Sequence, residues 1–150
     1  MQNTKPASNE RIAYGKLPWA ALLAALIAAV ANALVYFAAS GLGFIPQSVL
    51  IPTPSGEHPL TVAPVVVSSV VGAIGAAIVF AVIGLFARHP VRLFRIVATV
   101  VLVLSFAMPL TIPDAPVAMI LSLETMHIAA WAVIVGLLTS MARQAKAASA

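Results

Sequence analysis

Four long apolar segments, separated by polar or proline-rich stretches, dominate the sequence. They cover about residues 17–39, 62–86, 91–110 and 117–141. Each is long enough for an α-helix, rising about 1.5 Å per residue, to cross a hydrocarbon core of about 30 Å. The pattern therefore predicts an all-α fold, a four-helix transmembrane bundle over residues 17–141.

Transmembrane strands are a poor alternative, although valine is frequent in stretches such as APVVVSSVV and IVATVVLVL. A spanning strand belongs to a closed barrel and alternates in polarity over about ten residues. These segments do not alternate. In lipid, each backbone polar group needs a partner within the protein, and a helix supplies all of them inside one segment.

The stretches between and around the apolar segments are expected to be irregular. Residues 1–16 are polar and predict a disordered cytoplasmic tail, and residues 142–150 form a second short cytoplasmic tail. Residues 41–61 carry four prolines and three glycines, which predicts a loop. Its apolar FIPQSVLIP portion either lies in the membrane interface or folds over the mouth of the bundle.

The composition supports a membrane protein rather than a soluble domain. The chain is 62% hydrophobic and 8% charged, whereas a soluble domain is about 25% charged because its surface faces water. The net charge of +4 does not indicate a nucleic-acid partner, because the basic residues stand only at the ends of apolar segments. The chain has no cysteine, which excludes disulfides and thiolate chemistry.

The distribution of basic residues predicts the orientation. In a four-helix arrangement all eight lysines and arginines fall on one side of the membrane, and none is in the two opposite loops. The positive-inside rule then places both termini in the cytoplasm, in a bacterial inner membrane. A cleaved signal peptide is the alternative interpretation of the first segment, but its apolar region is usually only about 7–15 residues long. A retained helix is favoured.

Small residues indicate where helices could pack closely. Ser68, Gly72 and Ala76 recur every four residues, with Gly75 beside them, and close backbone approach at such residues drives helix association in lipid. Two interpretations stay open: packing within the bundle, against the alanine-rich first helix, and a dimer interface.

Several polar residues are expected to meet in the outer half of the bilayer. Glu124 and His127 are three residues apart on one helical face, which Trp131 extends. Intramembrane ionisable residues usually face a bundle interior and have partners. We therefore predict an outward-opening polar pocket formed by Glu124, His127, Asn32, Tyr36, Ser105 and Trp131. The alternative is that these side chains only hydrogen-bond between helices.

No metal site, cofactor or catalytic residue follows from the sequence. A Glu-x-x-His motif on a bundle helix occurs in di-iron proteins, but those have two such motifs and two further glutamates. The other histidines, His58 and His89, lie in connecting segments and are poorly placed to complete a haem site with His127. The chain contains none of the common nucleotide-binding or hydrolase motifs.

One stretch in each apolar segment is distinctive: AAVANALVYFAA, APVVVSSVVGAIGAA, HPVRLFRIVATVVLVLSF and LETMHIAAW. These stretches resemble a family of small bacterial four-helix membrane proteins classed as a domain of unknown function. The resemblance covers about residues 17–140, and Asn32 and Met126-His127 are its most distinctive positions. It implies the same four-helix topology and no established activity.

Three functional classes are compatible with these features. The first is a non-enzymatic accessory or small-ligand-binding bundle, which the sequence favours over an enzyme. The second is an oligomeric proton-coupled transporter with Glu124 and His127 as a relay. The third is a membrane-embedded enzyme acting on a lipidic substrate. The lipid bilayer is the expected partner in each case, and a homo-oligomer or a larger membrane complex fits the same features.

Overall fold

A computed structural model describes residues 11–53 and 56–142 of the chain. Its four long helices are α1 (Leu17–Gly41), α2 (Val62–Phe86), α3 (Pro90–Ser105) and α4 (Val117–Met141). Two short 3₁₀ helices, η1 (Tyr14–Lys16) and η2 (Pro109–Thr111), and two strands, β1 (Leu50–Thr53) and β2 (Gly56–Pro59), complete it. Within the described residues four helices are long and apolar enough to cross a membrane, which confirms the predicted four-helix bundle.

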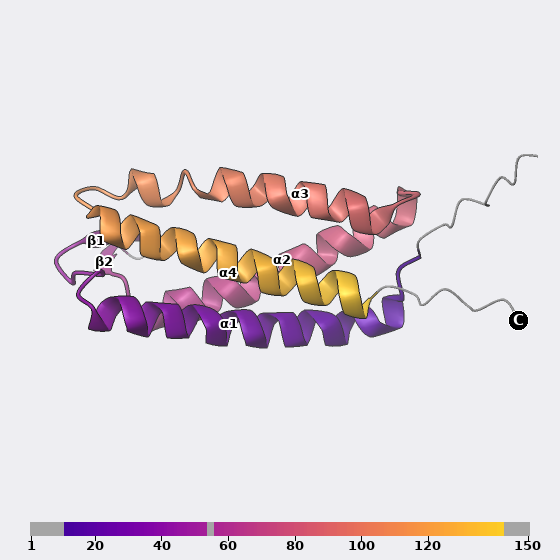
Figure 1. Cartoon of the computed structure of the whole chain (residues 1–150), viewed down its shortest axis with the longest axis horizontal. Coiled ribbons are helices and arrows are strands. Elements are labelled where there is room, and N and C mark those ends of the chain that lie inside the picture. Colours follow the sequence, from indigo (N-terminus) through magenta and orange to yellow (C-terminus); the bar gives the residue numbers. More distant parts are fainter. Residues whose placement is uncertain (1–10, 54–55, 143–150) are drawn as a thin grey trace, which may run out of the picture.

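Helix α1 is the element around which the bundle is built. It packs along both α2 and α4, whereas α3 stands apart from it on the far side of those two helices (Figure 1). Ala20, Ala24 and Ala28 on α1 are completely buried, as is Ala73 on α2. Because these side chains are so small, the helix backbones approach closely, which is the main source of packing energy in lipid.

Helix α3 is attached to the bundle chiefly by its first turns. Its buried residues are Pro90, Val91 and Phe94, and no later residue of the helix is buried. The Phe94 ring packs against Phe80 of α2, with ring centroids 4.6 Å apart. The rest of α3 therefore packs only loosely against its neighbours.

Helix α3 also ends earlier than the predicted boundary near residue 110. The regular helix stops at Ser105 and is followed by turns and then η2. Pro109 explains the position of this end, because a proline ring clashes with the carbonyl group four residues before it, which here belongs to Ser105. The span from Pro90 to Thr111 is nevertheless 22 residues long, and its mean hydropathy of 2.2 is high enough for a membrane span.

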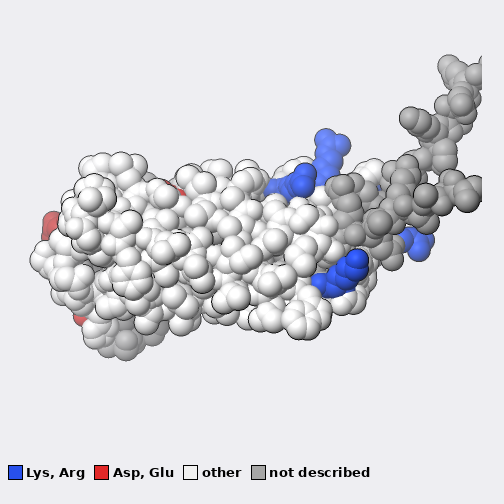
Figure 2. All heavy atoms as spheres, turned by 60° about the horizontal axis from the view of Figure 1, so that its bottom comes forward, with Lys and Arg blue, Asp and Glu red and all other residues white. Residues whose placement is uncertain are grey.

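The two ends of the bundle differ in charge. The described lysines and arginines all lie toward one end, and the red atoms of Asp and Glu lie mainly toward the other (Figure 2). We call the first the basic end and the second, which carries β1 and β2, the hairpin end. Lys5, Arg143 and Lys146, which the sequence analysis assigns to the basic side, lie outside the described residues.

The segment between α1 and α2 contains a β-hairpin, which the prediction of an irregular loop misses. β1 and β2 pair antiparallel, with Leu50 opposite Pro59 and Thr53 opposite Gly56. A two-stranded ladder tolerates prolines because every strand is an edge strand. Ile45, Val49 and Leu60 beside the hairpin are buried against α1 and α4. The apolar part of this segment thus covers one end of the bundle.

The N-terminal segment is ordered closer to the start than predicted. Residues 1–16 are assigned to a disordered tail by sequence, but residues 11–16 are folded against the bundle. Ile12 is buried in the main core. The backbone N–H of Ala13 donates to the carbonyl oxygen of Ala142 at 2.8 Å. One apolar side chain and one backbone pairing therefore fix a stretch whose overall polarity predicts disorder.

Replacing a buried alanine of the α1–α2 interface should destabilise the bundle. Ala73→Leu adds three carbon atoms at a position with no exposed surface, and such overpacking costs about 1–3 kcal/mol. We expect a lower free energy of unfolding in detergent titrations followed by circular dichroism. Ala132→Leu, at an exposed alanine of α4, should change it little. Equal effects of the two substitutions would contradict this account of the interface.

Candidate functional site

A cavity of about 760 Å³ lies between α2, α3 and α4. It lies where α3, beyond Phe94, packs only loosely against the other helices. It extends from Ile51 and Leu60 near the hairpin end to Phe94 toward the basic end. Its volume is within the range of about 300–1,000 Å³ that is usual for small-molecule sites. Most of its wall is aliphatic, and its polar wall residues are Asn32, Ser68, Ser69, Ser105, His127 and Trp131.

Asn32 and Ser69 form a buried hydrogen bond between α1 and α2 at the back of the cavity. The Asn32 side-chain Nδ2 donates to Ser69 Oγ at 2.9 Å, and Ser69 Oγ donates in turn to the Val65 carbonyl oxygen at 2.8 Å. Both side chains are about 95% buried. The Asn32 Oδ1 atom is also buried, and no described residue donates a hydrogen bond to it.

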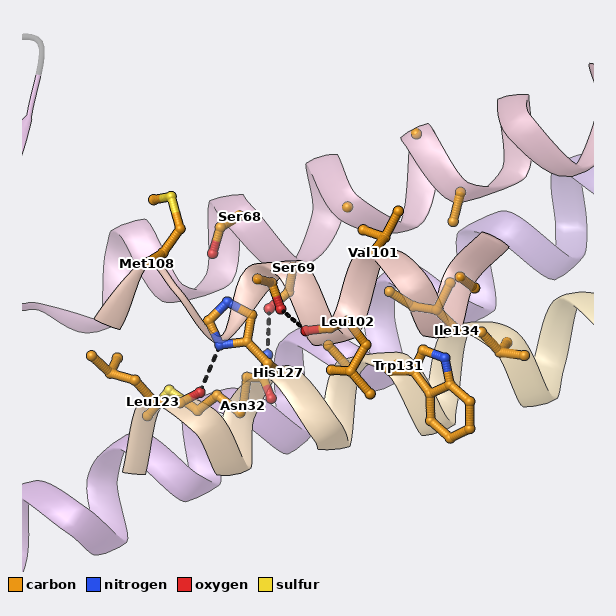
Figure 3. Close-up of a pocket in the computed structure, with 18 of the residues that line it drawn as sticks. Asn32, Ser68, Ser69, Val101, Leu102, Met108, Leu123, His127, Trp131 and Ile134 are labelled. Carbon is orange, nitrogen blue, oxygen red and sulfur yellow. Dashed lines mark hydrogen bonds between the residues drawn. The ribbon is translucent and has the colours of Figure 1, made fainter. Parts of the chain in front are cut away.

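His127 of α4 turns its ring into the cavity (Figure 3). Its Nδ1 lies 2.8 Å from the Leu123 carbonyl oxygen, one turn earlier in the same helix. Because a carbonyl oxygen can only accept, Nδ1 carries the proton of this hydrogen bond. In the neutral ring Nε2 is then a hydrogen-bond acceptor, and none of the described residues donates to it.

The serine hydroxyls on the cavity wall are turned toward their own helices. Ser68 Oγ donates to the Val65 carbonyl oxygen at 3.1 Å, and Ser105 Oγ donates to the Leu102 carbonyl oxygen at 2.7 Å. Such bonds to the preceding turn are common for serine within helices. They occupy the hydroxyl protons and leave oxygen lone pairs at the wall.

The structure brings four of the six residues of the predicted pocket to this cavity and leaves two outside it. Asn32, Ser105, His127 and Trp131 line the cavity, whereas Tyr36 and Glu124 do not. Tyr36 is buried on α1, and its hydroxyl donates to the Leu60 carbonyl oxygen at 3.1 Å. Tyr36 therefore fixes the segment that leads from the hairpin into α2.

Glu124 is half-buried beside the cavity. Its Oε2 atom is removed from solvent, and no described residue donates a hydrogen bond to it. The Trp131 Nε1 atom, two turns further along α4, is likewise shielded and has no acceptor among the described residues. Glu124 and His127 share one side of α4, but no hydrogen bond or ion pair joins them in the described part of the chain.

The predicted packing stripe also lines the cavity instead of contacting another helix closely. Ser68, Gly72, Gly75 and Ala76 all belong to the cavity wall. A Cβ atom built on either glycine meets no atom within 4 Å. The buried stripe of α2 is instead Ser69, Ala73 and Ala77, which is displaced by one residue, or about 100° around the helix.

Residues of α3 that the sequence analysis did not single out complete the site. Phe94, Val97, Ala98, Val101 and Leu102 line the cavity. Their three- and four-residue spacing marks one face of a helix, but the other faces beyond Arg95 are also mostly aliphatic, so the sequence does not single this face out.

A polar link between α3 and α4 lies at the basic end of the bundle and was also missed. Arg95 Nη2 donates to Thr139 Oγ1 at 3.2 Å. From the sequence, Arg95 is only an indicator of orientation. The available signal for this link is an arginine near the end of an apolar segment, because its long side chain can reach a neighbouring helix. The sequence does not identify Thr139 as the partner, which depends on how the helices pack.

Nothing in the described part of the chain forms a metal centre. No group of three or more His, Asp or Glu side chains lies close enough together to hold an ion there. His127 is the single ionisable side chain among the residues of the cavity wall. The arrangement is that of a largely apolar binding cavity with a few hydrogen-bonding atoms.

The fold and cavity define a multi-pass membrane protein, a four-helix bundle with a largely apolar cavity between three of its helices. The family described as "Family of unknown function (DUF6069)" matches residues 13–144, and the chain belongs to this family. The match covers all four helices and includes the residues of the cavity wall. Neither a curated protein nor a solved structure matches the chain.

The Asn32–Ser69 hydrogen bond can be tested with two adjacent serines. Ser69→Ala removes the bond to Asn32, and interhelical hydrogen bonds in membranes contribute about 0.6–2 kcal/mol. Ser68→Ala removes only a bond to the same Val65 carbonyl oxygen. We expect Ser69→Ala alone to lower the free energy of unfolding, measured in detergent titrations. If Ser68→Ala had the larger effect, the interhelical bond would not be the stabilising one.

Proposed function

We propose that this membrane protein is a non-enzymatic binding bundle that holds a small, largely apolar molecule in the cavity between α2, α3 and α4. The observation that carries the proposal is the cavity itself, which combines about 760 Å³ of space with a mostly aliphatic wall. Apolar pockets with a few convergent polar groups are the usual form of small-molecule sites. The family supplies no activity with which this role would conflict.

The chemistry of the wall favours binding over catalysis. General acid–base catalysis on a lipidic substrate generally involves positioned groups that take up and release protons at the reacting atoms. His127 is the single ionisable residue of the wall, and its Nδ1 is held by Leu123. An enzyme acting in this cavity would need a second such group from elsewhere.

A proton-coupled transporter has less support from the arrangement of α4. A relay requires groups joined directly or through water by hydrogen bonds, and Glu124 lies outside the wall that His127 lines. A transporter would also need a second copy or further helices to form a complete pathway. A homo-oligomer or a larger membrane complex is compatible with binding as well.

We also propose that the basic end faces the cytoplasm of a bacterial cell, so that both termini lie on the cytoplasmic side of the inner membrane. The support is the concentration of described lysines and arginines at that end (Figure 2) and the positive-inside rule. In this orientation the polar residues of the cavity lie in the outer half of the bilayer, and the hairpin faces outward.

The orientation can be measured with single cysteines, because the chain contains none. Glu57→Cys in β2 and Arg88→Cys in the turn before α3 are both exposed. A membrane-impermeant maleimide applied to intact spheroplasts should label position 57 and leave position 88 unlabelled until the membrane is permeabilised. Labelling of position 88 alone in intact spheroplasts would reverse the proposed orientation.

Filling the cavity should remove the bound molecule without unfolding the bundle. Gly75→Phe projects a ring into open space of the cavity, where it would crowd a bound molecule. Overpacking of about 1–3 kcal/mol corresponds to an affinity loss of about fivefold to 150-fold. Native mass spectrometry of protein released from membranes should show a bound small molecule on the natural chain and much less on this variant.

A second helical glycine provides the matched control for that experiment. Gly136 of α4 also has open space around it but does not line the cavity. Gly136→Phe should therefore retain the bound molecule. A natural chain with no bound small molecule, or equal occupancy in both variants, would contradict the proposed function.

A further inference from the structure

We infer that the molecule bound in the cavity is a neutral lipid-like alcohol or phenol whose hydroxyl group donates a hydrogen bond to Nε2 of His127. This inference rests on the proposed binding function and specifies the chemical class of its ligand. It follows from three properties of the wall: which polar atoms are free, which charges are absent, and where the polar atoms lie along the cavity.

The free polar atoms of the wall are mainly acceptors. The hydroxyl protons of Ser68, Ser69 and Ser105 are donated to carbonyl oxygens of their own helices. Asn32 donates one N–H to Ser69 and is 95% buried. The indole N–H of Trp131 is shielded from the cavity space. A ligand that supplies its own donor is therefore complementary to this wall.

His127 is the best-placed of these acceptors. The Leu123 carbonyl oxygen holds the Nδ1 proton at 2.8 Å, which fixes the tautomer and leaves the Nε2 lone pair free. The ring projects into the cavity from α4 (Figure 3). The Asn32 Oδ1 atom also has no described partner, but it is buried like the indole N–H of Trp131 and leaves His127 as the accessible acceptor. An acceptor enclosed in an apolar site lacks the hydrogen bonds of water, so a donor is favoured there.

The absence of fixed charge on the wall indicates a neutral ligand. None of the wall residues is a lysine, arginine, aspartate or glutamate. Removing a carboxylate, phosphate or ammonium group from water is unfavourable unless a partner charge compensates it. A fatty acid or phospholipid headgroup would find no such partner in the cavity.

The position of the polar atoms along the cavity matches a molecule that is polar at one end. Asn32, Ser69, Ser105 and His127 lie toward the hairpin end, whereas the wall nearer Phe94 is aliphatic and aromatic. A hydroxyl group beside His127 therefore leaves room for a hydrocarbon chain that extends toward the basic end. Hydrocarbon contact supplies the bulk of the affinity, and the hydroxyl group supplies the selectivity.

The test compares farnesol with farnesyl methyl ether, which has the same chain but no hydroxyl proton. The full-length protein carrying Trp19→Phe retains Trp131 as its one tryptophan, so fluorescence reports from the cavity wall. Titrations in detergent micelles give the two dissociation constants, corrected for partitioning into the micelle. One hydrogen bond to His127 should make farnesol bind about five- to tenfold more tightly than the ether.

Two variants in the same background identify the acceptor. His127→Phe keeps an aromatic ring without Nε2, so the preference for farnesol should fall to about one while the ether binds as before, which also shows that the variant is folded. Thr125→Val removes a polar group that bonds to the preceding turn of α4 but does not line the cavity. It should preserve the preference.

The possible results separate the inference from the proposed function. Equal binding of farnesol and the ether to the Trp19→Phe protein would overturn the donor inference and leave the apolar cavity function standing. A preference that persists in His127→Phe would overturn the assignment of His127 as the acceptor. Absence of binding by both compounds would overturn the inference and the proposed function together.

Discussion

The close approach of α1 to α2 and α4 is the interaction on which the other features depend. In lipid, apolar surface gains little from meeting another apolar surface, so helices associate where their backbones come near each other. The buried stripe Ala20, Ala24, Ala28 and Asn32 runs along α1 at four-residue spacing. The one asparagine of this stripe, Asn32, lies opposite Ser69 of α2. The hydrogen bond between the two side chains therefore adds a polar contact to an otherwise apolar α1–α2 interface and specifies the register of the two helices.

Helix α3 has no comparable stripe of small residues, and the cavity results from this difference. Its sequence after Arg95 is dominated by valine, isoleucine and leucine, whose bulk keeps backbones apart. Contacts at Phe94 and Arg95 hold its first turns, and its regular structure ends before the chain meets the bundle again at Pro109, which is buried where η2 contacts α4. The same sequence features that make α3 a good lipid-facing helix thus leave space between it and its neighbours.

The architecture could be predicted from the sequence because lipid imposes simple requirements on length and apolarity. The composition of the site could be predicted only in part, because it depends on the rotation of each helix about its axis. A rotation of α2 by one residue, about 100°, decides whether Gly72 or Ala73 faces α1. The sequence of α2 is largely apolar on all sides and has little periodicity from which to choose between the two rotations. Tyr36 lies outside the cavity because its hydroxyl donates to the backbone carbonyl of Leu60, a partner that no side-chain pattern reveals.

The peripheral attachment of α3 has a consequence for how such a chain can change over evolutionary time. Residues that determine folding lie in the interfaces of α1 with α2 and α4. Many of the residues that shape the cavity lie on α3 and on the side of α2 that faces away from α1. Substitutions at positions such as Val97, Val101 or Gly75 can therefore alter ligand fit with little effect on assembly of the bundle. Selection for stability and selection for ligand preference act on largely different residues of the same small protein.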